Sequence, residues 1–431
     1  MAAPALYGLS LSPVLAAPRP ALFHALCVLG LFGYQTLDAV DGKHARATNS
    51  SSPLGQLFDH GCDAISVTFA TLICAMTLQL SPEAFLAILA ATHVPFFVAQ
   101  WSERHTHVLR TSVGPIGLTE TQLFAMALPL ASAVSPAFWV SALPVAVAEK
   151  LAAVLVALPF PLYNWLGWAS AGAMAQGLRF HHVVLALYAT TAAVATVSVI
   201  IDTVLVLKKK NKLAEAEAEA ETVDVSTANA VAAADAACAP CCPIVAALAK
   251  PCDLLSKFMC LSSSSSSSKC CFASKSKSCS ALKELVPALS LCALTYLWTT
   301  APLAATEGFF AFPLLAPLTL GTYFTKLSCE MIIAAMSRDA FPACSLSLLP
   351  LAAHIAAVTL FPGATVALGG TVSGAAAVRV TVSTVTLAVA VAGAAATLTV
   401  FVVGAALQIA RYLGIYVLVQ GRRPEVADKS E

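Results

Sequence analysis

Residues 37–63 read LDAVDGKHARATNSSSPLGQLFDHGCD and join two apolar windows, 21–38 and 63–80. Each window is long enough, as a helix, to cross most of a bilayer's hydrocarbon core. Between them, residues 48–53 are polar, serine-rich and closed by proline, which is typical of a tight reversal between helices. The stretch therefore predicts two membrane helices joined by a short turn. Charge beside a membrane span is costly, so its four aspartates indicate a function.

Composition extends this prediction to the whole chain. Of the 431 residues, 58% are hydrophobic and only 11% charged, whereas a soluble domain carries about a quarter charged residues. We therefore predict an all-α, polytopic membrane helical bundle with about ten transmembrane helices. A net charge of +1 gives no reason to expect nucleic acid as a partner. The expected spans are 3–17, 21–38, 63–80, 84–101, 122–142, 146–170, 181–206, 281–304, 308–326, 343–361 and 377–417, the last holding two crossings or one long tilted helix.

Changes in composition divide the chain into three regions. Residues 1–206 form an N-terminal membrane bundle, 207–280 a low-complexity insertion loop rich in Lys, Glu, Ala, Cys and Ser, and 281–431 a set of C-terminal membrane helices. We expect the insertion to be disordered at its polar ends. Basic residues after a span favour the cytosolic side. That rule places the insertion and the C-terminus in the cytosol, on the basis of Lys208, Lys209, Lys210, Arg422 and Arg423.

Helical geometry gathers the acidic residues of 37–63. At about 100° per residue, Asp38 and Asp41 share one stripe of the first helix with Gly42 and Ala45. On the second helix, Gly55, Asp59 and Asp63 share one face at spacings of four. Two facing helices would therefore bring four carboxylates into one small volume.

Four carboxylates repel one another unless a cation lies between them. All-oxygen ligands favour Mg²⁺ or Mn²⁺ over zinc, and a quartet of carboxylates can hold two ions about 4 Å apart. We therefore expect a divalent metal at Asp38, Asp41, Asp59 and Asp63. The small residues Gly42, Ala45 and Gly55 leave room for a nucleotide, and Arg46 offers a planar fork for phosphate oxygens.

The same residues carry a resemblance to the CDP-alcohol phosphotransferase family, whose signature holds four aspartates, two glycines, an alanine and an arginine in this order. All eight positions match with the family spacing. The segment DGKHARATNSSSPLGQLFDHGCD resembles the eukaryotic cholinephosphotransferase and ethanolaminephosphotransferase branch. Weaker similarity continues through AQWSERHTHVLRTSVGPIGLTETQ and TKLSCEMIIAAMSR. Relatives usually carry a longer N-terminal region.

The resemblance implies an enzyme that transfers phosphoethanolamine or phosphocholine from CDP-ethanolamine or CDP-choline to diacylglycerol, releasing CMP and forming phosphatidylethanolamine or phosphatidylcholine. The four aspartates would hold the two ions, and Gly42, Ala45, Arg46 and Gly55 would shape the nucleotide pocket. It further implies a multi-pass protein of the endoplasmic reticulum or Golgi membrane with its active site open to the cytosol. Family members are often dimers, which makes a homodimer one candidate assembly.

The reaction also needs a base for the acceptor hydroxyl. Asp63 is one candidate, and His60, which titrates near neutral pH, is another. We favour His60 oriented by Glu120 of the LTETQ segment, with Asp63 as a metal ligand. Two rival functions stay open: a membrane ion-coupled transporter, which can also use intramembrane carboxylates, and a catalytically silent relative kept for assembly.

Overall fold

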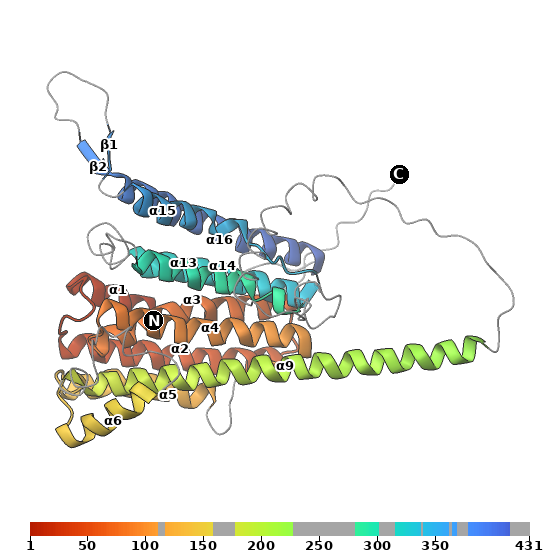
Figure 1. The fold of residues 1–431 in the computed structure, drawn as a ribbon, viewed down its shortest axis with the longest axis horizontal. Helices are drawn as coiled ribbons and strands as arrows, with labels where there is room; N and C mark the ends of the chain where they lie inside the picture. Colours follow the sequence, from red (N-terminus) through yellow and green to blue (C-terminus); the bar gives the residue numbers. More distant parts are fainter. Residues whose placement is uncertain are drawn as a thin grey trace, which may run out of the picture.

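The computed structural model describes residues 1–110, 117–157, 177–226, 281–300, 315–337, 339–361, 364–368 and 378–413. Over these residues the protein is a bundle of α-helices, as the composition predicts (Figure 1). One antiparallel hairpin departs from a purely helical fold, with β1 (Thr365–Leu368) paired to β2 (Val378–Thr381). The main helices are α1 (Ala2–Leu11), α2 (Ala21–Ala47), α3 (Pro53–Thr77), α4 (Pro82–Thr106), α5 (Leu118–Val134), α6 (Val145–Ala157), α9 (Phe180–Ser226), α13 (Val286–Thr300), α14 (Leu315–Ser337), α15 (Leu349–Leu360) and α16 (Val382–Leu413).

Six helices of the described chain are long and apolar enough to cross a membrane. They are Ala21–Ala47, Pro53–Thr77, Ala84–Thr106, Phe180–Leu213, Ala281–Thr299 and Val382–Arg411. These helices identify an integral membrane protein, although the expected ten spans are not confirmed. The expected spans at 3–17 and 343–361 correspond to the shorter apolar helices Ala2–Leu11 and Leu346–Leu360. The window 377–417 contains one long helix, α16, so the single-helix alternative fits it, and much of 146–170 lies outside the described residues.

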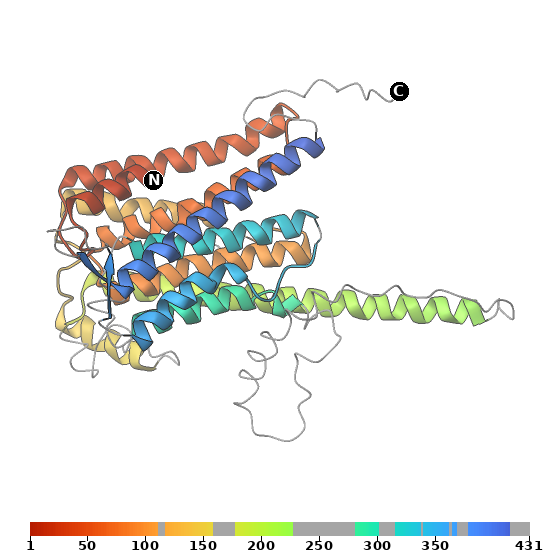
Figure 2. The same cartoon turned by 90° about the horizontal axis from the view of Figure 1, so that it is seen from above.

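The helix α3 lies in the middle of the bundle, packed on α14 and α4 (Figures 1 and 2). At Gly321 of α14 a Cβ atom would overlap the side chain of Thr68, so glycine permits the two backbones to approach closely. One turn further along, the Thr325 hydroxyl donates to the Ala64 carbonyl at 3.2 Å. Hydroxyl and glycine contacts of this kind join helices where apolar side chains gain little from leaving lipid.

The helix α9 runs along the bundle and continues past its end, as both views show. It is unbroken from Phe180 to Ser226. The expected boundary at residue 206 is therefore no break in secondary structure, and residues 207–226 are helical where we expected a disordered polar end. Alanine, glutamate and lysine all have high helix propensity, which accounts for the continuation. The rest of the insertion, 227–280, lies outside the described residues.

The last turn of α4 joins three other parts of the chain. Glu284, just before α13, accepts from Arg104 Nε at 3.2 Å and lies 2.8 Å from His105 Nε2. Arg104 also donates to the carbonyls of Ala334 and Asp339. The Lys210 ammonium of α9 donates to the His105 carbonyl at 3.2 Å. The Lys run, Lys208 to Lys210, follows the apolar part of α9 and thus lies at the same end of the bundle as the C-terminus of α4.

Candidate functional site

The turn between α2 and α3 has the geometry that its sequence predicts. Asn49 adopts a left-handed φ of 53°, as asparagine often does just after a helix. The Ser50 amide then donates to the Ala45 carbonyl at 2.9 Å. Ser52 caps α3, its hydroxyl accepting from the Gly55 amide at 3.1 Å, and Pro53 follows at the first helical position. This short reversal places the end of α2 against the start of α3.

Three of the four predicted carboxylates converge across this turn. Asp38 and Asp41 of α2 and Asp59 of α3 each offer an oxygen, and these oxygens all lie within 4.8 Å of one another. Oxygen ligands on opposite sides of a Mg²⁺ ion are about 4.2 Å apart, twice the metal–oxygen distance. The spacing therefore fits a divalent cation. Asp41 is exposed and the other two are half-buried, so the cluster is open to a ligand on one side.

The fourth carboxylate, Asp63, is outside that three-residue cluster. It lies one turn further along α3, where the Tyr34 hydroxyl of α2 donates to its Oδ1. Asp63 is half-buried and lines the pocket described below. The structure thus brings Asp38, Asp41 and Asp59 together and holds Asp63 beside them through Tyr34.

The predicted nucleotide-binding positions border the same cluster. At Gly42 an added Cβ would meet Arg46 Nη1 at 3.4 Å and no backbone, because the Arg46 side chain folds back over Gly42. At Gly55 an added Cβ would meet the Ser52 hydroxyl, also at 3.4 Å. The protein's own packing therefore tolerates a methyl group at both positions. Any strict need for glycine there must come from a molecule bound outside the helices.

His60 and Glu120 are not joined by a hydrogen bond in this structure. The Gln100 side-chain amide of α4 lies 3.1 Å from His60 Nδ1. Glu120 instead accepts from the Gly117 amide at 2.8 Å, capping the first turn of its own helix α5. A glutamate at the third helical position commonly fills this role. The His60–Glu120 pair stays a prediction, and Gln100 is the observed neighbour of His60.

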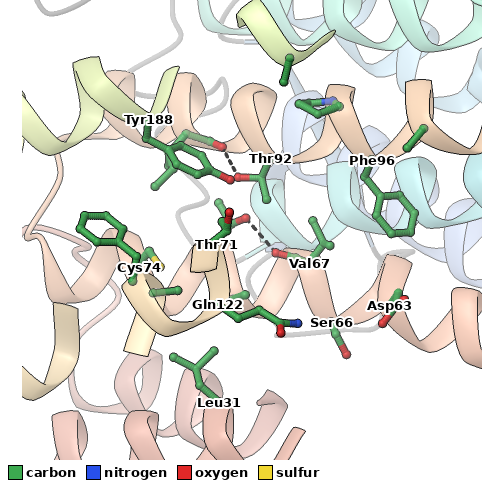
Figure 3. A pocket seen from close by; sticks show the side chains of 18 of the residues that line it. Leu31, Asp63, Ser66, Val67, Thr71, Cys74, Thr92, Phe96, Gln122 and Tyr188 are labelled. Atoms are coloured by element: carbon green, nitrogen blue, oxygen red, sulfur yellow. Dashed lines mark hydrogen bonds between the residues drawn. The ribbon is translucent and has the colours of Figure 1, made fainter. Parts of the chain in front are cut away.

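An apolar pocket of about 360 Å³ opens beside these residues (Figure 3). His60, Asp63, Tyr34 and Gln100 line one part of it. The rest is lined mainly by apolar side chains of α3, α4, α5 and α9, including Leu78, Ile88, Phe96, Leu128, Val184, Leu185 and Val199. Its wall on α3 runs from His60 to Leu78, which is about 27 Å at 1.5 Å per residue. The pocket therefore reaches from the carboxylates deep into the bundle.

Three polar residues of the site were not predicted from the sequence. Tyr34 precedes Asp38 by four positions and so shares its helical stripe, a signal that the 3.6-residue period carries. Gln100 and Gln122 lie in the AQWSER and LTETQ segments that carry the resemblance. No local pattern links them to the site, because their position beside it depends on how α4 and α5 pack on α3.

Comparison with known proteins agrees with this geometry. Residues 14–158 match the family model of CDP-alcohol phosphatidyltransferase. Over 120 residues the chain is 45% identical to cholinephosphotransferase 1 of Xenopus laevis, covering 27% of this chain and 29% of the frog protein. Over 109 residues it is 47% identical to choline/ethanolaminephosphotransferase 2 of Arabidopsis thaliana, covering 25% of this chain and 28% of the plant protein.

A third relative is cholinephosphotransferase 1 of Homo sapiens, 40% identical over 117 residues that cover 27% of this chain and 28% of the human protein. The matched part thus spans less than a third of the length of each of these three relatives. Residues 14–158, which the family model matches, contain the whole α2–α3 turn and all eight positions singled out above. The part of this chain that holds the carboxylate cluster therefore matches the CDP-alcohol phosphatidyltransferase family model.

Proposed function

We propose that this protein transfers phosphocholine or phosphoethanolamine from CDP-choline or CDP-ethanolamine to diacylglycerol, with release of CMP. The observation that carries the proposal is the convergence of the Asp38, Asp41 and Asp59 oxygens within 4.8 Å at the end of two apolar helices. The names of the relatives, which are cholinephosphotransferases and choline/ethanolaminephosphotransferases, supply the reaction class.

The donor set fits Mg²⁺ or Mn²⁺. It consists of carboxylate oxygens, the ligands that these ions prefer. Asp38, Asp41 and Asp59 would hold the first ion, and Asp63 would complete a site for two. Ions held there would supply positive charge to neutralise the pyrophosphate and the CMP leaving group. Gly42, Ala45 and Gly55 leave space for the nucleotide backbone beside the helices.

Arg46 supplies the remaining positive charge at the nucleotide site. Its guanidinium lies against Gly42, on the helix that bears Asp38 and Asp41. A planar guanidinium can donate two parallel hydrogen bonds to a phosphate. Arg46 therefore binds a phosphate of the CDP carrier and fixes its orientation.

His60 serves as the base that removes the acceptor's proton. For Nε2 to accept that proton, Nδ1 must carry the other hydrogen and donate it to a neighbouring oxygen. The Gln100 amide, whose Nε2 lies 3.1 Å from Nδ1, provides this partner when the amide is turned so that its oxygen faces the ring. Glu120 takes the same orienting role only if it leaves the Gly117 amide on substrate binding. Asp63 is then free to act as a metal ligand.

The apolar pocket receives the acceptor lipid. It contains His60 and Asp63 and extends along α3 for about the thickness of the hydrocarbon core. A diacylglycerol whose acyl chains lie among Leu128, Leu185 and Val199 would present its hydroxyl at the polar end. Water is sparse in so apolar a pocket, which disfavours hydrolysis of the CDP-alcohol.

The site opens on the side that carries the Lys run. Lys210 donates to the last turn of α4, and Gln56, beside Gly55, lies 3.5 Å from Glu103 in that same turn. If Lys208, Lys209 and Lys210 mark the cytosolic face, the active site faces the cytosol, where CDP-alcohols are soluble. We place the protein in the endoplasmic reticulum or Golgi membrane, with a homodimer as the assembly to test.

Purified protein in detergent, given diacylglycerol, Mn²⁺ or Mg²⁺ and each labelled CDP-alcohol in turn, tests the proposal. Label should pass to the lipid fraction with equimolar CMP, and chelation of the ions should stop it. Absence of transfer from either donor, in the presence of measured CDP binding, would identify a silent relative instead. Ion uptake into proteoliposomes without CMP release would identify a transporter.

A further inference from the structure

Gln122 of α5 is a polar side chain whose hydrogen-bonding groups are unmet inside the pocket. It is half-buried and lines the pocket together with Asp63 and Ser66. Figure 3 shows it reaching toward Ser66, with Asp63 beyond on α3. Among the described residues, Gln122 has no hydrogen-bond partner. A carboxamide carries two donor hydrogens and an acceptor oxygen, so its position toward an open cavity leaves them for a ligand.

The other polar side chains of the pocket are already engaged. Tyr34 donates to Asp63, the Gln100 amide lies beside His60, and Arg110 pairs with Asp202 at 2.6 Å. Four threonine hydroxyls donate to the carbonyl four residues earlier in their own helices: Thr71, Thr92, Thr121 and Thr196. Ser66 interacts with Tyr34, and Tyr188 with Thr92. Gln122 is thus the polar side chain of this lining that has no hydrogen-bond partner among the described residues.

The proposed acceptor lipid carries groups that the Gln122 amide can bind. Diacylglycerol carries two ester carbonyls within a few bonds of its reacting hydroxyl, and both are acceptors without a hydrogen to donate. An amide that donates to one of them fixes the glycerol backbone while the acyl chains fill the apolar part. Resting on the function proposed above, we infer that Gln122 binds an ester carbonyl of the acceptor and makes the protein prefer ester-linked over ether-linked glycerolipids.

The test compares two acceptors that differ only at this group. These are 1,2-dioleoylglycerol and its dialkyl ether analogue, which lacks both carbonyls. One neutral hydrogen bond is worth about 1 kcal/mol, or about a fivefold change in affinity. The wild-type KM should therefore be about fivefold lower for the diester. Gln122→Leu should raise the KM for the diester to that of the ether analogue, and leave the KM for the ether and for the CDP-alcohol unchanged.

A matched control makes the same substitution elsewhere. Gln79 lies outside this pocket, where its amide donates to the Pro136 carbonyl at 3.0 Å. Gln79→Leu should keep the fivefold preference for the diester, whatever it does to stability. An equal effect of Gln122→Leu on both acceptors, or no effect on either, overturns the inference, because each result shows that no carbonyl is bound.

Binding without turnover separates this inference from the proposed function. Native mass spectrometry of the purified protein with each lipid, in the absence of any CDP-alcohol, reports acceptor binding directly. A protein that transfers nothing but binds the diester about fivefold better, with the preference lost in Gln122→Leu, retains the inference and loses the function. A protein that transfers phosphocholine but binds both lipids equally retains the function and loses the inference.

Discussion

Replacing Gly42 by alanine should separate the stability of the protein from its activity. Gly42 lies inside α2, where glycine costs about 0.5–1 kcal/mol relative to alanine. An alanine Cβ would meet the Arg46 guanidinium, nearest at Nη1 at 3.4 Å, which is ordinary contact with a flexible side chain. Gly42→Ala should therefore leave the unfolding temperature in detergent unchanged or raise it slightly.

The same methyl group would occupy the space that we assign to the nucleotide. Forcing one extra methyl into a filled site costs about 1–3 kcal/mol, which corresponds to a loss of about 5- to 150-fold in kcat/KM. The assay is transfer of labelled phosphocholine at varied CDP-choline, with the unfolding temperature measured in parallel. Gly33→Ala on the same helix is the control, because a Cβ there meets nothing within 4 Å. Full kcat/KM in Gly42→Ala would refute our placement of the nucleotide.

Three further predictions concern the carboxylates, the base and the ion pair between Arg104 and Glu284 at the end of α4. Asp59→Asn should lower kcat at least about 100-fold at any Mn²⁺ concentration and weaken metal-dependent CDP binding, so CDP affinity that survives the substitution contradicts its role as ligand. Gln100→Leu should reduce kcat about 10-fold or more, with little change in the KM for CDP-choline, since general-base catalysis is worth at least that; a change in KM alone would argue for a binding role. Glu284→Gln should destabilise the protein by about 3 kcal/mol, because it leaves the mostly buried Arg104 without its charged partner. An unchanged unfolding temperature would show that this ion pair does not stabilise the fold.

The sequence predicted most of what is local and little of what depends on packing. The helical period placed Asp38 and Asp41 on one stripe, and the Ser-Ser-Pro signal placed the turn into α3, because both depend on neighbouring residues alone. The partner of Glu120 was not predictable in the same way. A glutamate three residues after a glycine can cap its own helix or reach across to His60, and only the packing of α5 on the bundle decides between them. Gln100 was missed for the same reason.

Helix α14 lies outside the residues that the family model matches, yet it helps to position the site. The family model matches 14–158, but α3 is held on its other side by α14, through the close approach at Gly321 and the hydrogen bond from Thr325 to the Ala64 carbonyl. Ala64 directly follows Asp63, so a shift of α14 would move the part of α3 that carries Asp59, His60 and Asp63. A bulky residue at Gly321 should therefore impair metal-dependent CDP binding, although it lies far along the chain from every carboxylate. If Gly321→Val unfolds at the wild-type temperature and binds CDP normally, α14 does not position α3 in the way that this packing indicates.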